Sequence, residues 1–214
     1  MNIIQDNFHF LLQGAGITLK VSILAASFGL VIGSIMSLFR ISNNFLLKAV
    51  SGIYVEVIRG TPLLIQVLYL YFGLYQVGIR LPPLTAGIVA LSINSGAYVT
   101  EIIRSGIQSI DKGQMEASRS LGMNYMLTMR HVILPQAFRR IIPPMVNELI
   151  ALIKDSSLLS VIGIVELARV GQLVRAKTYD TFYIMTAVAI TYFIMTFSLS
   201  TLLGYIERRW QIRD

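Results

Sequence analysis

The segment Ile17–Phe39 reads ITLKVSILAASFGLVIGSIMSLF and contains a single charged residue, Lys20. It is long enough to cross a hydrocarbon core of about 30 Å as a helix, which takes about 20 apolar residues. It is also too long and continuous for a strand of a membrane barrel, which alternates over about 10 residues. Because a chain in lipid must satisfy its backbone polar groups internally, the segment predicts a membrane-spanning helix.

Four further apolar runs follow this segment. The predicted spans are Ile53–Leu74, Leu84–Ile103, Ile141–Ile164 and Phe182–Ile206. Only 14% of the 214 residues are charged, well below the roughly 25% of an average soluble domain. We therefore expect an all-α integral membrane protein with five membrane-spanning helices in one domain, residues 1–214.

The positive charges are unevenly distributed around the predicted spans. Eleven of the 18 Lys and Arg residues fall on one side, four on the other, and three at or inside a span. Since Lys and Arg are enriched in cytoplasmic loops, we expect the N-terminus outside and the C-terminus inside. The net charge of +7 does not indicate nucleic-acid binding, because the charges flank apolar runs instead of forming a basic stripe.

The sequence lacks the clustered residues that metal sites usually need and the cysteines that thiol chemistry needs. The chain has no cysteine, which excludes disulfides, thiolate metal sites and thiol nucleophiles. His9 and His131 lie far apart in the sequence and have no neighbours of the metal-binding type. We therefore expect no metal site and no cofactor in this chain.

The longest polar segment connects the third and fourth predicted spans. Asp111, with Gln114 three residues later, resembles a capping box that starts a helix, and Gly122 can end that helix in a left-handed cap. Asn124 can start a second short helix, which Pro135 stops or bends into the next span. We expect a helix–turn–helix under the membrane, on its cytoplasmic side, over residues 105–139.

This loop reads Glu-Ala-Ser-Arg-Ser-Leu-Gly over residues 116–122 and Ile-Leu-Pro over residues 133–135. It resembles the EAA loop of permeases of ATP-binding-cassette (ABC) importers, with Ser118 in the second Ala position. Three more segments, in order and at matching spacing, resemble the polar amino-acid branch of that family, which includes histidine, arginine and glutamine permeases. They are Arg59–Leu64, Tyr98–Ile107 and Lys154–Leu158.

The resemblance implies a type I importer fold in the bacterial cytoplasmic membrane. The helix pair would dock into a groove on a separate ATPase subunit and transmit its closure; a plain solvated loop is the alternative. Because the chain has no Gly-rich phosphate loop of the GxxxxGK[ST] kind, we expect no enzymatic activity in it, with ATP and Mg²⁺ bound by the partner. The residues expected to carry the coupling are Glu116, Ala117, Ser118, Leu121, Gly122 and Pro135.

The resemblance also implies the partners of the chain. They are two ABC ATPase subunits, an external substrate-binding protein, and a second permease subunit that is either an identical copy or a sister chain. Five helices make a thin wall for a pathway, which also favours two permease subunits facing each other. The expected mechanism is alternating access.

Charged residues inside the predicted span 141–164 are the first substrate candidates. Glu148 and Asp155 are seven residues apart, which places them on one helical face about 10 Å apart along the axis. We expect this face to line the pathway. One carboxylate would meet a cationic side chain of the substrate, and the other, or Asn147 and Ser156, would meet its ammonium group.

An internal ion pair between Lys154 and Asp155 is an equal alternative for those two residues. Their Lys-Asp-Ser-Ser-Leu pattern resembles relatives of differing specificity, whereas Glu148 lies outside that pattern. Glu148 is therefore the expected specificity residue. Two acidic residues on this face favour basic amino acids as substrates. Glutamine or another polar amino acid is the alternative, and an ion-coupled secondary transporter is a more distant one.

Two earlier spans supply further candidates. Asn94 and Tyr98 lie four residues apart on one helical face and are expected ligands of the substrate. The run 95–97, Ser-Gly-Ala, favours close helix packing, and Glu101 with Arg104 predicts a local ion pair. The break at 59–62, Arg-Gly-Thr-Pro, indicates either a transporter site or a simple kink, and Arg59 is expected to pair with Glu56.

Overall fold

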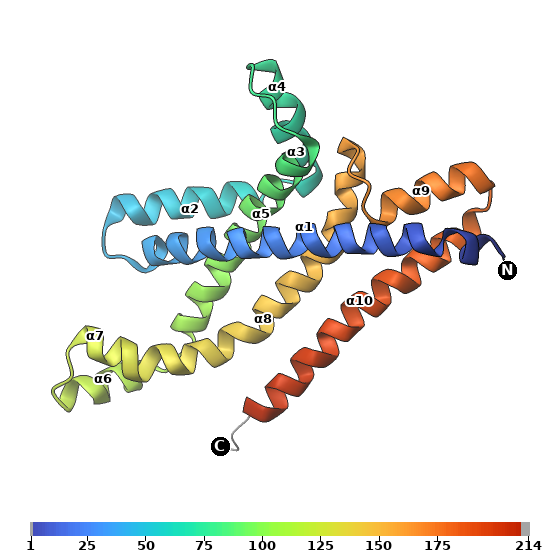
Figure 1. Cartoon of the computed structure of the whole chain (residues 1–214). Coiled ribbons are helices and arrows are strands. Elements are labelled where there is room, and N and C mark those ends of the chain that lie inside the picture. Colours follow the sequence, from blue (N-terminus) through green and yellow to red (C-terminus); the bar gives the residue numbers. More distant parts are fainter. Residues whose placement is uncertain (1, 211–214) are drawn as a thin grey trace.

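The computed structural model describes residues 2–210, and the side chains of residues 5–205. The described part is helical throughout, with no strand (Figure 1). Three helices are long and apolar enough to cross a membrane: α1 (Asn2–Ile41), α5 (Pro83–Gln108) and α10 (Thr181–Trp210). Each of them contains one of the predicted spans and extends beyond it.

The predicted span 53–74 is not one straight helix. It is divided into α2 (Phe45–Arg59) and a second piece that contains α3 (Leu63–Leu68), a π-helical turn at Tyr69–Gly73 and α4 (Leu74–Gln76). The second piece is bent by 103° relative to the first. Only together are the two pieces long and apolar enough to cross a membrane. Pro62 has no N–H to donate within the helix, and it stands at the start of α3 in an extended conformation.

The predicted span 141–164 also differs from a single apolar helix. Its first part belongs to α8 (Leu134–Asp155), which continues as the 3₁₀ segment η3 (Ser156–Ile162) and ends at Gly163 with a left-handed φ of 87°. Within the described residues, this segment is not among the helices that are both long and apolar enough to cross a membrane. The segment between this span and the last predicted span contains a helix of its own, α9 (Leu167–Thr178).

Small residues bring α1 and α5 into close contact. A Cβ atom added to Gly33 would lie 2.4 Å from Cγ1 of Val99, and one added to Gly29 would lie 2.9 Å from Cβ of Ser95. A Cβ on Gly96 would meet Ile32 at 2.8 Å. The prediction that the run 95–97 serves helix packing is therefore confirmed.

Buried side chains form separate clusters. The largest joins α1, α5, α8 and η3 through residues such as Val21, Leu91 and Leu152. A second joins the start of α1 to α9 and α10 through Leu11, Leu167 and neighbouring residues. The helix pair α6 (Lys112–Ser120) and α7 (Tyr125–Thr128) lies at the opposite end of the molecule from α9 and the N-terminus (Figure 1).

Candidate functional site

The break between α2 and α3 is held together by Gln66. Its Nε2 donates to the carbonyl oxygen of Ile58 at 2.8 Å and to the carbonyl and hydroxyl oxygens of Thr61 at 3.1 and 2.9 Å. The Thr61 hydroxyl in turn donates to the carbonyl of Val57 at 2.9 Å. The Gln66 side chain thus takes the place of backbone donors that the interrupted helix lacks.

Gln66 also connects this break to α5. Its Oε1 accepts a hydrogen bond from Nδ2 of Asn94 at 3.0 Å, and Asn94 is 7% exposed. Asn94 therefore lies at the break, as a candidate ligand would, but its amide nitrogen already has a partner. Gln66 was missed in the sequence, because a glutamine in an apolar segment shows no sign of a partner 28 residues away.

Arg59, the last residue of α2, lies over the aromatic ring of Tyr98, with its guanidinium carbon 5.0 Å from the ring centroid. Such a cation–π contact leaves the guanidinium N–H groups free to bind an anion. The expected ion pair between Glu56 and Arg59 is wrong, because the one ion pair among the described side chains joins Arg104 to Glu101. That second pair confirms the prediction for Glu101 and Arg104.

Glu148 on α8 faces the same region. Its carboxyl lies beside the hydroxyl of Ser95 and close enough to Asp155 and Arg59 for their charges to act on it. Ser95 is fully buried, and its hydroxyl forms no hydrogen bond with any described residue. The carboxylate of Glu148, the guanidinium of Arg59 and the buried hydroxyl of Ser95 therefore lie in one region around α5, close enough for the two charges to act on each other without forming an ion pair. We call Arg59, Ser95, Tyr98 and Glu148 the central polar cluster.

The other predicted residues of α8 lie in different surroundings. Asn147 is exposed, and Asp155 is half-buried at the end of the helix, where Lys154 is the nearest cation but does not form an ion pair within the described part. Ser156 is fully buried, and its hydroxyl donates to the carbonyl of Ile153 at 2.8 Å. The structure thus brings Glu148 to the central polar cluster and leaves Ser156 in the packing of its own helix.

A second polar group that the sequence analysis missed surrounds Glu166, which precedes α9 and is fully buried. Its carboxylate accepts hydrogen bonds from the backbone N–H groups of Ala168 and Arg169, at 2.8 and 2.7 Å, and from the hydroxyl of Tyr192 at 2.8 Å. Thr18 on α1 accepts from the N–H of Leu167 at 3.2 Å. Burial raises the pKa of Glu166, and these donors act against that shift.

The predicted helix pair is present at α6 and α7. Asp111 caps α6 by accepting from the N–H of Gly113 at 2.7 Å, and Asn124 caps α7 by accepting from the N–H of Leu127 at 2.9 Å. Gly122 between them has a φ of 85°, which confirms the left-handed turn. The side chain of Gln114 is not part of a capping box; its Oε1 accepts from Gln136 at 3.4 Å.

Among the predicted coupling residues, Glu116, Ala117, Leu121, Gly122 and Pro135 are exposed. Leu121 is 84% exposed at the tip of the turn, whereas Ser118 is 6% exposed and packs inward. Pro135 does not stop the second helix. A π-helical turn, η2 (Met129–Ile133), precedes it, so α7 continues into α8 with Pro135 in the first turn, where its missing N–H is tolerated.

The chain is similar to curated proteins over nearly its whole length. It is 44% identical over 204 residues to the glutamine transport system permease protein GlnP of Escherichia coli (strain K12), covering 94% of this chain and 93% of that relative. The corresponding protein of Shigella flexneri gives the same values.

Solved structures show the same architecture. The crystal structure of an amino acid ABC transporter with histidines contains a chain that is 45% identical, covers 96% of both chains and superposes with a TM-score of 0.93. The inward-facing MetNI methionine ABC transporter is 22% identical over 94% of this chain and 96% of that one, and its TM-score of 0.77 shows a shared fold. The model of the binding-protein-dependent transport system inner membrane component matches residues 29–212. The chain therefore belongs to the family of inner membrane components of binding-protein-dependent transport systems.

Proposed function

We propose that this chain is the permease subunit of an ATP-driven importer of polar amino acids, with glutamine as the favoured substrate. The observation that carries the proposal is that Glu148 and Arg59 lie in the same polar cluster without forming an ion pair, so that an anionic and a cationic group are both left for a ligand. An amino acid is a zwitterion, so its ammonium group would bind the Glu148 carboxylate and its carboxylate would bind the Arg59 guanidinium. The buried Ser95 hydroxyl lies beside Glu148 and would help to hold its carboxylate in place.

Glutamine replaces basic amino acids as the first choice of substrate. The acidic face of α8 favoured arginine, lysine or histidine, but the relatives at 44% identity are named for glutamine transport. If Glu148 binds the ammonium group common to all amino acids, its charge no longer requires a cationic side chain. Basic amino acids remain the second candidate, because the solved relative at 45% identity is described with histidines. Asn94, Tyr98, Asn147, Asp155 and Ser156 remain proposed as substrate contacts or their supports.

The proposed topology has five crossings, with the N-terminus outside and the C-terminus in the cytoplasm. The crossings are α1, the bent pair of α2 with α3 to α4, α5, α8 with η3, and α10. Four of these are long and apolar enough to cross a membrane, when the bent pair is counted as one crossing. The fifth, α8 with η3, is amphipathic and would be tolerated because its polar groups face the protein and the pathway.

The partners follow from membership of the family. A binding-protein-dependent system needs an external substrate-binding protein, and the chain itself needs an ATPase to drive it. We propose two permease and two ATPase subunits per complex, with ATP and Mg²⁺ held by the ATPases. The helix pair α6–α7 would be the cytoplasmic docking element, with contacts from Glu116, Ala117, Ser118, Leu121, Gly122 and Pro135. Closure of the ATPases would bring the two helix pairs together and open the cavity outward, which is alternating access.

The test is reconstitution of the complex in proteoliposomes with its binding protein, followed by uptake and ATPase assays over a panel of amino acids. The proposal requires ATP-dependent uptake of glutamine in preference to arginine, lysine and histidine. A preference for the three basic amino acids would establish the second candidate. Uptake by this chain alone, driven by a proton or sodium gradient without an ATPase, would contradict the importer assignment and favour a secondary transporter.

A further inference from the structure

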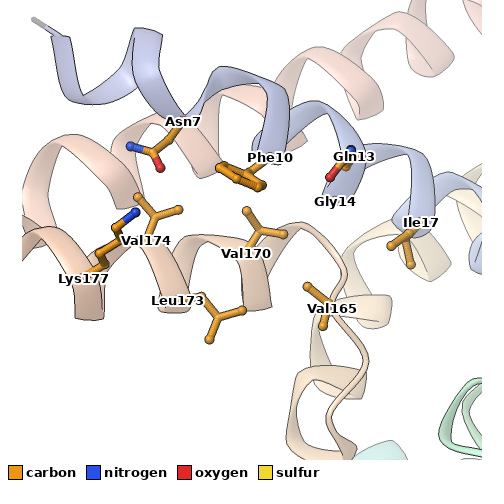
Figure 2. Close-up of a pocket in the computed structure, with 10 residues that line it drawn as sticks. All are labelled: Asn7, Phe10, Gln13, Gly14, Ile17, Val165, Val170, Leu173, Val174 and Lys177. Atoms are coloured by element: carbon orange, nitrogen blue, oxygen red, sulfur yellow. The ribbon is translucent and has the colours of Figure 1, made fainter.

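A groove of about 260 Å³ runs between the start of α1 and α9 (Figure 2). Apolar side chains from both helices form its walls, among them Phe10, Val170 and Leu173. At one end the walls give way to Lys177 and Asn7, which lie on opposite sides of the groove (Figure 2). The groove is therefore a long apolar space with a positive charge at its mouth.

Helix α9 carries an unbalanced positive charge. It contains Arg169, Arg175 and Lys177 and no acidic residue. Arg175 and Lys177 are exposed, and neither forms an ion pair with any described side chain. An amphipathic helix with basic residues on its polar face is typical of elements that lie in the membrane interface.

Exposed aromatic side chains follow Lys177 closely in the sequence. Tyr179 is 92% exposed, and Phe182 and Tyr183 at the start of α10 are 74% and 61% exposed. Tyr179 holds a left-handed φ of 59°, which is uncommon for a residue other than glycine. Tyr and other aromatic residues are enriched at the level of lipid headgroups. These residues therefore place the mouth of the groove beside the headgroups.

We propose that this groove binds an anionic phospholipid, with an acyl chain between α1 and α9 and the phosphate beside Lys177. Charge complementarity selects this occupant, because the apolar walls suit an acyl chain and the cation at the mouth suits a phosphate, whereas an apolar protein helix would not need the cation. The lipid would fill the space between α1 and α9 and stabilise α9 at the outer surface. The assignment depends on α9 lying at the membrane surface and not on the identity of the transported amino acid.

Tryptophan fluorescence tests the proposal. The chain has one tryptophan, Trp210, so Leu173→Trp in a Trp210→Phe background puts this chain's one tryptophan in the groove, and the complex with Trp210→Phe alone gives the signal of the partner subunits to be subtracted. The assembled complex is placed in vesicles of brominated phosphatidylglycerol or brominated phosphatidylcholine mixed with unbrominated lipid. We expect phosphatidylglycerol to be preferred about fivefold, since one Lys near an anionic lipid contributes about that factor. Lys177→Gln should remove the preference.

Two controls define the result. Lys48→Gln removes an exposed charge from α2 and should leave the preference at Leu173→Trp unchanged, and Ile53→Trp on α2 should show no preference. Equal quenching by both lipids, or an equal loss with Lys48→Gln, would overturn the proposal. Absence of quenching by either lipid would mean that a second copy of the chain covers the groove, which overturns it as well. If Leu173→Trp does not fold, native mass spectrometry should find phosphatidylglycerol retained by the unmodified complex and lost from Lys177→Gln; retention by both refutes the site.

Discussion

Glu148 is the residue whose charge most needs a partner. A charged side chain in the middle of a membrane costs about 2.5–3.5 kcal/mol on insertion scales. Within residues 5–205 no Lys or Arg forms an ion pair with it, and Arg59 acts on it only at longer range. In the proposed function, the ammonium group of the substrate would be the partner of this carboxylate.

Replacing Glu148 by glutamine keeps the shape of the side chain and removes its charge. A hydrogen bond to a charged group contributes about 1.5–3 kcal/mol, so we expect the transported amino acid to bind about 10–100-fold more weakly. The measurement is the substrate concentration that gives half-maximal uptake in proteoliposomes. Asp6→Asn, an exposed carboxylate near the start of α1, is the matched control. Normal uptake of glutamine, arginine and lysine by Glu148→Gln would remove this residue from the site.

Gln66 gives a prediction about stability. Gln66→Leu leaves the carbonyl of Ile58 and the amide of Asn94 without their partners. Each unsatisfied buried group costs about 1–3 kcal/mol. We expect the Tm in detergent to fall by at least about 2–4 °C, the shift that 1 kcal/mol gives in a chain of this size. Gln76→Leu, exposed at the end of α4, should leave Tm unchanged, and an equal shift in both variants would contradict the role of Gln66.

At the scale of the elements, Glu166 joins three helices. Its carboxylate caps α9 and accepts from Tyr192 on α10, while Thr18 on α1 accepts from the first N–H of α9. Since α9 has 12 residues and a basic, polar face, it depends on these contacts as well as on the apolar residues beneath it.

A double-mutant cycle tests this connection. Glu166→Ala, Tyr192→Phe and the double variant should show a coupling free energy of about 0.5–3 kcal/mol, because the two side chains share one hydrogen bond. The free energies of unfolding are measured by SDS titration. Tyr183→Phe, an exposed tyrosine on the same helix, is the control and should show no coupling with Glu166→Ala. Strict additivity for Glu166 and Tyr192 would mean that the bond does not hold α9 to α10.

Gly122, in the turn between α6 and α7, has a matched control in Gly78, which follows α4. Gly122 and Gly78 have φ values of 85° and 89°, and a Cβ atom on either would meet nothing within 4 Å. Alanine at each should therefore destabilise the chain by a similar 1–2 kcal/mol from the left-handed backbone alone. If α6–α7 is the docking element, Gly122→Ala should also lower substrate-stimulated ATPase activity, measured per assembled complex. Equal ATPase activity in Gly122→Ala and Gly78→Ala would argue against that role.

Helix ends that are set by neighbouring residues could be predicted from the sequence. Asp111, Gly122 and Asn124 act on backbone groups within three residues, so the start and end of α6 and the start of α7 could be read from the sequence. The position of the bend at Pro62 could be predicted from the sequence. Its angle of 103° could not, because the angle depends on how the two pieces pack against other helices. Gln66 and Glu166 were missed because their partners lie 28 and 26 residues away. Helix α9 was not predicted, because its basic residues interrupt the apolar pattern of the sequence.

At the scale of the whole molecule, one helical run connects the two candidate sites. From Tyr125 to Asp155 the chain passes through α7, the π-helical turn η2 and α8 without leaving the helical conformation (Figure 1). Its first turns belong to the helix pair, and its later turns carry Glu148. A displacement of α6–α7 by a partner would therefore reach the central polar cluster along this run, with the π-helical turn and the interior Pro143 and Pro144 of α8 as the places where the run can bend.

The orientation of the whole chain is open to a direct test, because the chain has no cysteine and every introduced thiol is unique. Leu121 and Tyr179 are 84% and 92% exposed, and the elements that they follow, α6 and α9, lie at opposite ends of the molecule (Figure 1). With the N-terminus outside, a membrane-impermeant maleimide added to intact spheroplasts should label Tyr179→Cys and should reach Leu121→Cys only after the membrane is permeabilised. The reverse pattern would place α6–α7 outside the cell, where no ATP-driven subunit could engage it, and labelling of both positions in intact spheroplasts would mean that these two ends do not lie on opposite sides of the membrane.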